Sequence, residues 1–175
     1  MATIHMKGFM TREEWVSCED GWRMLRLVGA VSGPPEDDQR RHLVLAACKC
    51  ARLALPYAGQ GETWSLSTIE IAERWARGEG VNPEDVFSAV RAASALAEAT
   101  PHDPAAQAAW NAASCSAAAV YCAAAHVSFP AGHAASCARD AARAAGSPDA
   151  EKQVLRDCAE IVRRAFPEPA GGSPR

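Results

Sequence analysis

Three helix starts occur in the chain in the same form, and they constrain the fold more than any other feature. Each is a capping residue followed by proline: Asn82-Pro83, Asp103-Pro104 and Ser147-Pro148. The side chain of the capping residue accepts a hydrogen bond from an amide of the first turn. Proline is tolerated there because those amides have no partner within the helix. Helices are therefore predicted to begin at these three places.

The rest of the chain also has helical spacing, and no segment alternates between apolar and polar residues as a strand does. Thr11 and Glu14 form a capping box at the start of a first helix, and Asp20 caps a second. Residues 42–55 are apolar on nearly all sides, which is typical of a helix at the centre of a bundle. We therefore predict an all-α fold, a compact bundle of about eight helices with an alanine-rich helical hairpin.

The domain boundaries follow from the same signals. With 175 residues the chain is long enough for one domain with its own core. Residues 10–166 are predicted to be this single helical domain, and residues 1–9 an N-terminal extension without a periodic pattern. Residues 167–175 are rich in Pro, Gly and Ser, so they are predicted to be a disordered tail.

Charge and hydropathy argue against two classes of partner. The formal net charge is -3, so the excess of Lys and Arg that favours nucleic-acid binding is missing. No apolar run approaches the length of about 20 residues that a membrane-spanning helix needs. The seven cysteines are an odd number, and most lie in predicted helices, which is typical of reduced core thiols. The expectation is a cytoplasmic protein that binds neither nucleic acid nor membranes.

Several blocks of sequence carry a family resemblance. They are residues 10–18 (MTREEWVSC), residues 38–52, residues 69–76 and the Leu-Arg-Asp at 155–157. Together with the alanine-rich middle, they resemble a large uncharacterised family of paralogous helical proteins known mainly from planctomycete genomes. The resemblance covers roughly residues 10–166. It implies a helical fold, with no established activity and no catalytic residues.

The clearest chemical hint lies in the alanine-rich stretch from Asp103 to Gly146. Two cysteine–histidine pairs with i,i+4 spacing flank an expected break at Ser128–Gly132, and each pair lies on one face of its helix. They are Cys122 with His126, and His133 with Cys137. Folded about that break, the two pairs face each other and match the Cys2His2 ligand set of structural zinc.

Zinc binding by this cluster is kept as the alternative function. The same four residues also fit a simpler interpretation, in which the cysteines are core thiols and the histidines lie at the rim of the core. The spacing matches no common zinc finger, and alanine-rich helices accept cysteine as a small core residue. Cys48 and Cys50 are two residues apart on a helix, so their side chains diverge and are assigned to the core. No other cofactor is indicated.

No motif for an enzyme was found in the chain. The Glu-x-x-His pairs of di-iron bundles, phosphate-binding glycine loops and the G-x-S-x-G element are all absent from the sequence. Catalysis by another arrangement stays open as a third alternative, but no catalytic residue is assigned.

Two of the five tryptophans suggest a binding role. Trp64 lies at the edge of a loop and Trp110 lies among alanines, so either could be an exposed anchor for a protein partner. Filling of the core is the competing interpretation for each. The sequence therefore favours a non-enzymatic protein-interaction or scaffolding module that binds a protein partner or a second copy of itself.

Overall fold

The chain folds as a bundle of α-helices, described here from a computed structural model that covers residues 10–31, 38–59, 62–99, 103–120, 128–146 and 148–168. Within these ranges there are eight α-helices, one short 3-10 helix and no strand. The elements are α1 (Arg12–Ser17), α2 (Gly21–Val31), α3 (Asp38–Arg52), η1 (Leu55–Tyr57), α4 (Glu62–Ala76), α5 (Pro83–Ala99), α6 (Pro104–Ala118), α7 (Ser128–Ala144) and α8 (Pro148–Ala165). The predicted all-α class is confirmed.

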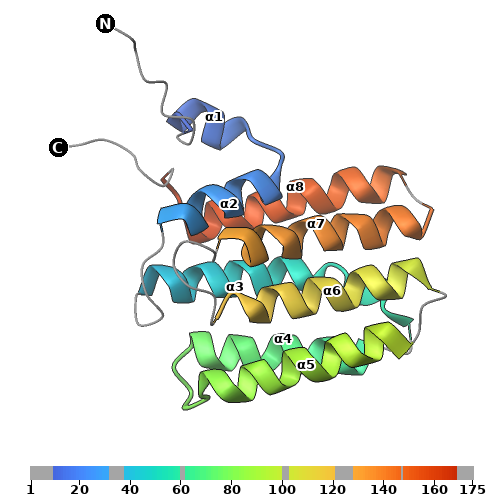
Figure 1. The fold of residues 1–175 in the computed structure, drawn as a ribbon. Helices are drawn as coiled ribbons and strands as arrows, with labels where there is room; N and C mark the ends of the chain where they lie inside the picture. The colour runs from blue at the N-terminus through green and yellow to red at the C-terminus, as the bar shows by residue number, and fades with distance from the viewer. Residues whose placement is uncertain are drawn as a thin grey trace, which may run out of the picture.

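The helices stack in three layers (Figure 1). Helices α2, α7 and α8 form one outer layer, α3 and α6 form the middle, and α4 and α5 form the other outer layer. Short α1 lies beyond the first outer layer, next to the end of α8 (Figure 1). The most extensive contact between two helices joins α6 to α7 and so connects the middle layer to the first outer layer.

The helix starts are those that the capping residues predict. Asp103 Oδ1 accepts hydrogen bonds from the amides of Ala105 and Ala106, at 3.0 and 3.1 Å. Asn82 caps α5 in the same way, through the amide of Asp85. Helix α8 begins at Pro148 as expected, although Ser147 itself lies outside the described residues.

The predicted break at Ser128–Gly132 is wrong. These residues form the first turn and more of α7, and the connection from α6 lies between Ala118 and Ser128. Pro130 is the third residue of the helix, where its missing N–H breaks no intrahelical hydrogen bond. Proline followed closely by glycine therefore marks a helix start here. Because α7 begins at Ser128, earlier than the predicted break allows, its residues face other residues of α6 than the prediction assumed.

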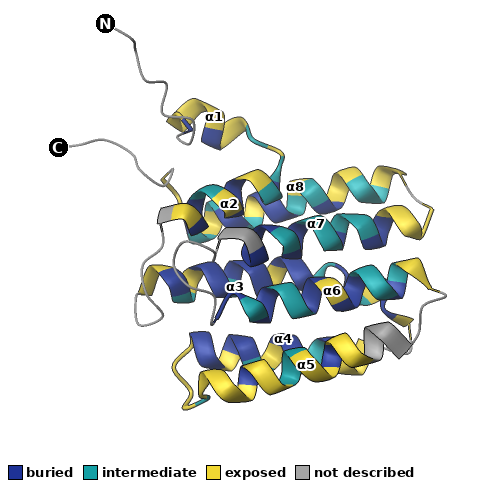
Figure 2. Cartoon of the chain, viewed as in Figure 1, coloured by how far each residue is buried: buried dark blue, intermediate teal, exposed yellow. Residues whose placement is uncertain are grey.

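Helix α3 is the central element, as its apolar sequence predicts. It packs against α2, α4, α6, α7 and α8, and its side chains are mostly buried (Figure 2). Arg40, at its start, is fully buried, which the sequence does not predict. Much of the remaining core consists of alanine from α6 and α7, whose small side chains permit short distances between helix axes. The fully buried alanines of α7 are Ala131, Ala134, Ala135, Ala138, Ala141 and Ala142.

The two ends of the helical domain are joined. Trp15 is buried, and its Nε1 donates a hydrogen bond to the carbonyl oxygen of Phe166 at 3.1 Å. Arg163 on α8 donates a second one, from Nη1 to the carbonyl oxygen of Cys18 at 2.6 Å. These contacts tie the first described helix to the last, and a single domain over residues 10–166 stays a prediction. The predicted extension at 1–9 and most of the predicted tail lie outside the described residues.

An ion pair between α3 and α4 leads to a stability prediction. The Glu73 carboxylate is largely buried and accepts two hydrogen bonds of 2.8 Å from Arg52, one from Nε and one from Nη2. Glu73→Ala leaves the half-buried guanidinium without this partner, so we expect a loss of about 2 kcal/mol in the free energy of unfolding. Urea denaturation measures the loss. Glu70→Ala, an exposed change on the same helix, is the control, and an equal effect of both variants would contradict the prediction.

Candidate functional site

The structure describes only half of the predicted zinc cluster. His133 and Cys137 are half-buried on α7, while Cys122 and His126 lie outside the described residues. In the described part of the chain, no three His, Cys, Asp or Glu side chains are grouped as a metal site requires. Zinc binding by the four residues therefore stays a prediction.

Cys137 does have a facing cysteine in the structure, and it is Cys115. The two thiols interact across the contact between α6 and α7, and a hydrogen bond between them is the main cause of the pKa shift of each. We call these two residues the seam pair, because they lie along the contact between α6 and α7. Both side chains are half-buried and both thiols are free.

The position of the break explains why the sequence analysis did not single out Cys115. A break at Ser128–Gly132 puts Cys137 opposite Cys122. With α7 starting at Ser128, the facing residue on α6 lies earlier in the chain, and Cys115 occupies that place. The available signal was Pro130, which is compatible with the first turn of a helix as well as with a break.

The hydrogen bond makes the two thiols of the seam pair chemically unequal. The hydrogen bond with Cys137 lowers the pKa of the Cys115 thiol, because it stabilises the thiolate. The same hydrogen bond raises the pKa of Cys137, and burial and the Asp140 carboxylate raise it further, while Arg139 opposes them. Of the two thiols, Cys115 therefore loses its proton more readily and Cys137 is the hydrogen-bond donor.

The other buried cysteines have a different environment. Cys50 and Cys158 are fully buried, and their thiols interact between α3 and α8. We call these two residues the core pair. The hydrogen bond with Cys158 and burial both raise the pKa of Cys50. Burial raises the pKa of Cys48 to about 12. Cys48 and Cys50 are thus core thiols, as the sequence predicts.

The two tryptophans proposed as anchors differ in exposure. Trp64, on α4, is 56% exposed, in agreement with the expected exposed side chain. Trp110, on α6, is only 6% exposed, so its proposed role as an exposed anchor is wrong. Alanine neighbours leave room around a tryptophan, and here the ring fills that space within the bundle. Partner binding by Trp64 stays a prediction.

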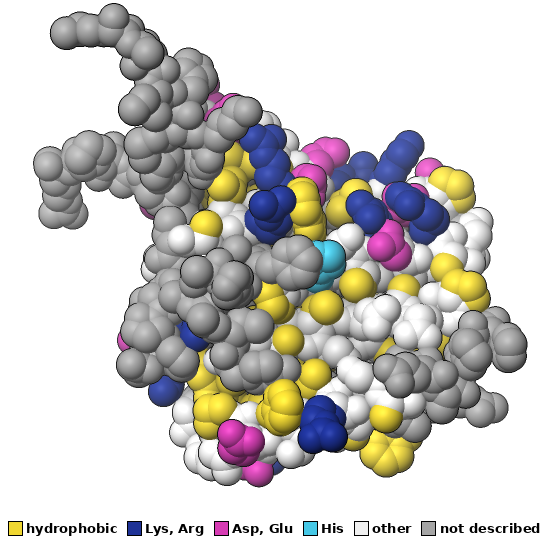
Figure 3. Space-filling model, in the orientation of Figure 1, with side chains coloured by type: hydrophobic (Ala, Val, Ile, Leu, Met, Phe, Trp, Pro, Cys, Tyr) yellow, Lys and Arg dark blue, Asp and Glu magenta, His cyan; other side chains and the backbone are white. Residues whose placement is uncertain are grey.

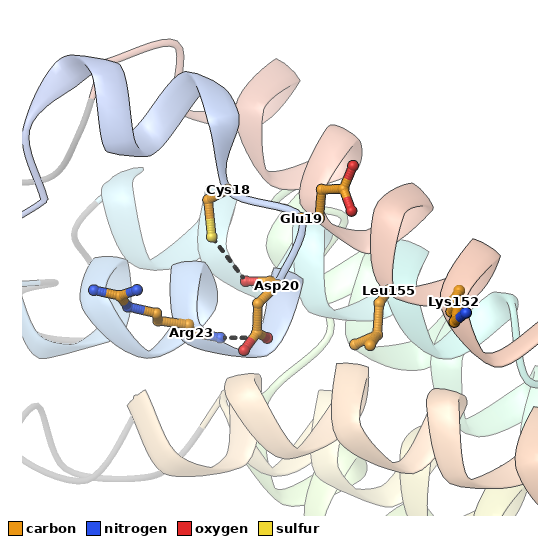
Figure 4. A pocket seen from close by; sticks show the side chains of 6 residues that line it. All are labelled: Cys18, Glu19, Asp20, Arg23, Lys152 and Leu155. Atoms are coloured by element: carbon orange, nitrogen blue, oxygen red, sulfur yellow. Dashed lines mark hydrogen bonds between the residues drawn. The ribbon is translucent and has the colours of Figure 1, made fainter.

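A surface hollow of about 430 Å³ lies between the α1–α2 connection and α8. Its lining consists of Cys18, Glu19, Asp20, Arg23, Lys152 and Leu155 (Figure 4). Asp20 caps α2 by accepting a hydrogen bond from the amide of Arg23 at 3.1 Å. The charged ends of Arg23 and Lys152 point away from each other (Figure 4). The hollow therefore does not concentrate charge of one sign on a ligand.

None of the helices in the described part of the chain has the length and apolar character needed to cross a bilayer. Comparison with known proteins gives no family: no protein-family model, curated protein or solved structure matches the chain. The resemblance to the planctomycete family therefore stays an expectation.

Proposed function

We propose that the chain is a non-enzymatic, cytoplasmic, helical protein-interaction module that binds through the outer surface of the α4–α5 layer. Trp64 carries the proposal. A tryptophan that is 56% exposed leaves a large apolar surface in water, and tryptophan is enriched among the residues that dominate binding energy. Phe87 on α5 is 41% exposed and adds a second aromatic ring to the same layer.

The outer face of α5 supports this choice of surface. Helix α5 packs mainly against α4 and α6, and the rest of its circumference is exposed (Figure 2). Between Phe87 and Ala95, several exposed side chains are small, and a small side chain allows another helix to approach closely. The exposed small residues are Ser88, Ala92, Ser94 and Ala95.

Charge on this surface makes a second copy of the chain the simplest partner. Glu84 and Asp85 start α5, and Arg91 lies one turn beyond Phe87, with its guanidinium 5.9 Å from the ring centre. Hydrophobic, acidic and basic side chains lie near one another along the α5 edge in Figure 3. A surface with both signs of charge can match itself about a two-fold axis.

Co-purification tests the proposal with matched variants. A tagged wild-type chain is expected to retain an untagged copy or another protein from the cell. We expect Trp64→Ala to weaken this retention by about thirty-fold, because a central tryptophan contributes about 2 kcal/mol or more to binding. Val16→Ala is the control, since Val16 is 62% exposed but lies on α1, on the far side of the bundle from the α4–α5 layer (Figure 1). Equal retention by all three chains would contradict the proposal.

A further inference from the structure

Two close pairs of thiols occur in the described part of the chain, and they differ in accessibility. The core pair, Cys50 and Cys158, is fully buried between α3 and α8. The seam pair, Cys115 and Cys137, is half-buried, so a small solute can reach it from the surface. The protein thus contains a partly exposed pair and, in the same fold, a fully buried counterpart.

We propose that the seam pair is a peroxide-sensitive site at which Cys115 and Cys137 are oxidised to a disulfide that joins α6 to α7. Two features of the geometry support this. Cys115 and Cys137 lie on the two helices that share the most extensive contact in the bundle, and both side chains are partly exposed. The interaction between the two thiols, which shifts the pKa of each, agrees with a short distance between the sulfur atoms. A disulfide forms where the two Cα atoms lie about 4.4–6.8 Å apart, a spacing that closely packed helices can supply.

The reaction has two steps, and hydrogen peroxide is the oxidant. The Cys115 thiolate attacks one peroxide oxygen, the O–O bond breaks, and Cys115 becomes a sulfenic acid while the second oxygen takes a proton and leaves as water. The Cys137 sulfur then attacks the Cys115 sulfur. The S–O bond breaks, the S–S bond forms, and the Cys137 proton leaves with the hydroxyl group as water. In total, two thiols and one peroxide give one disulfide and two waters.

The environment of the seam pair determines which thiol reacts first. Peroxide reacts with thiolates, and the hydrogen bond from Cys137 favours the thiolate of Cys115. Asp140 disfavours ionisation of Cys137, and Arg139 only partly offsets this. Cys115 is therefore the residue that attacks peroxide and Cys137 is the residue that resolves the sulfenic acid.

Oxidation links two positions on either side of the connection between α6 and α7. The disulfide would remove conformational freedom from the unfolded chain, so the oxidised protein should melt at a higher temperature than the reduced protein. A dithiol reductant reverses the reaction. The site therefore responds reversibly to peroxide, and this inference does not depend on the proposed binding face.

The test treats the full folded chain with hydrogen peroxide, blocks remaining thiols by alkylation, and locates the disulfide by mass spectrometry. Trypsin is unsuitable, because the segment from Ala92 to Arg139 has no internal Lys or Arg and contains three cysteines. Chymotrypsin cuts after Trp110 and Tyr121, which places Cys115 on a peptide of its own. Because Pro130 blocks cleavage after Phe129, fragmentation of the cross-linked peptides identifies whether Cys122 or Cys137 is bonded to Cys115. We expect a cross-linked peptide pair that contains Cys115 and Cys137.

The core pair serves as the internal control. Cys115 should be oxidised faster than Cys50 by on the order of ten-fold or more, because burial protects the core pair. Oxidation of the two pairs at equal rates would overturn the proposal. A disulfide through Cys122 in place of Cys115 or Cys137 would do the same, so Cys122→Ser is also tested and should leave the seam disulfide unchanged.

Single serine variants separate the two roles within the seam pair. In Cys137→Ser, the sulfenic acid on Cys115 has no resolving thiol, so a carbon nucleophile such as dimedone should label Cys115. In Cys115→Ser, Cys137 should remain unlabelled under the same conditions. Labelling of Cys137 in that variant would contradict the assigned order of reaction. The wild-type mapping needs no substitution and stays decisive if a variant folds poorly.

Discussion

Gly21→Ala is expected to lower the free energy of unfolding by about 3 kcal/mol, since an added methyl group has no space at this position. A Cβ on Gly21 would lie 2.4 Å from Cys158 Cβ and 2.8 Å from both Cys158 C and Ala159 N. Two of these atoms belong to the backbone of α8, so the clash can be relieved only by moving one helix away from the other. Glycine at the start of α2 is what allows α2 and α8 to touch.

Gly132→Ala provides the matched comparison, because it is also a helical glycine at a close contact. Its Cβ would meet Arg26 Cγ at 2.7 Å and Trp22 Cδ1 at 3.3 Å. Arg26 is exposed and its side chain can shift, so the expected loss is smaller, about 1 kcal/mol. Guanidinium denaturation of both variants beside the wild type measures the difference. Two equal midpoints would show that α2 and α8 are not in backbone contact at Gly21.

Ala135→Leu should also destabilise the protein by about 3 kcal/mol, because α7 is packed through its alanines. Ala135 is fully buried, and α7 is surrounded by α2, α3, α6 and α8. A leucine there would force these helices apart or take an unfavourable rotamer. The size of the effect depends on how close the helices lie, which makes this substitution a direct probe of alanine packing.

Ala144→Leu is the control for the alanine prediction. Ala144 ends the same helix but is exposed, so the added side chain meets solvent and the change should stay within about 0.5 kcal/mol. Thermal and denaturant unfolding of the two variants give the comparison. If Ala135→Leu unfolds at the same denaturant concentration as Ala144→Leu, the close packing of α7 is wrong.

The fold was predictable from the sequence where the deciding signals are local. Capping residues act over three or four positions, so Thr11, Asn82 and Asp103 mark the starts of α1, α5 and α6 correctly. The apolar sequence of α3 also predicts its central place. Pro130 shows the limit of such signals, because proline is compatible with a helix break and with a first turn.

The candidate site was less predictable, because it depends on contacts between distant segments. Cys115 and Cys137 face each other only in the register that α6 and α7 adopt, and that register depends on where α7 begins. Trp64 is exposed and Trp110 is buried, although both lie in helices, so the local sequence does not distinguish them. Arg40 is buried because other helices surround the start of α3, and the neighbouring residues in the sequence do not predict that arrangement.

The central claim is that the chain binds proteins through the α4–α5 layer, and light scattering across a wide concentration range tests it most directly. For the wild-type chain, the account predicts a molar mass that rises with concentration from the 18.5 kDa of one chain towards that of two. Trp64→Ala should stay at the mass of one chain, and Val16→Ala should follow the wild type. A wild-type mass that never exceeds one chain, together with no protein retained in co-purification, would contradict the account.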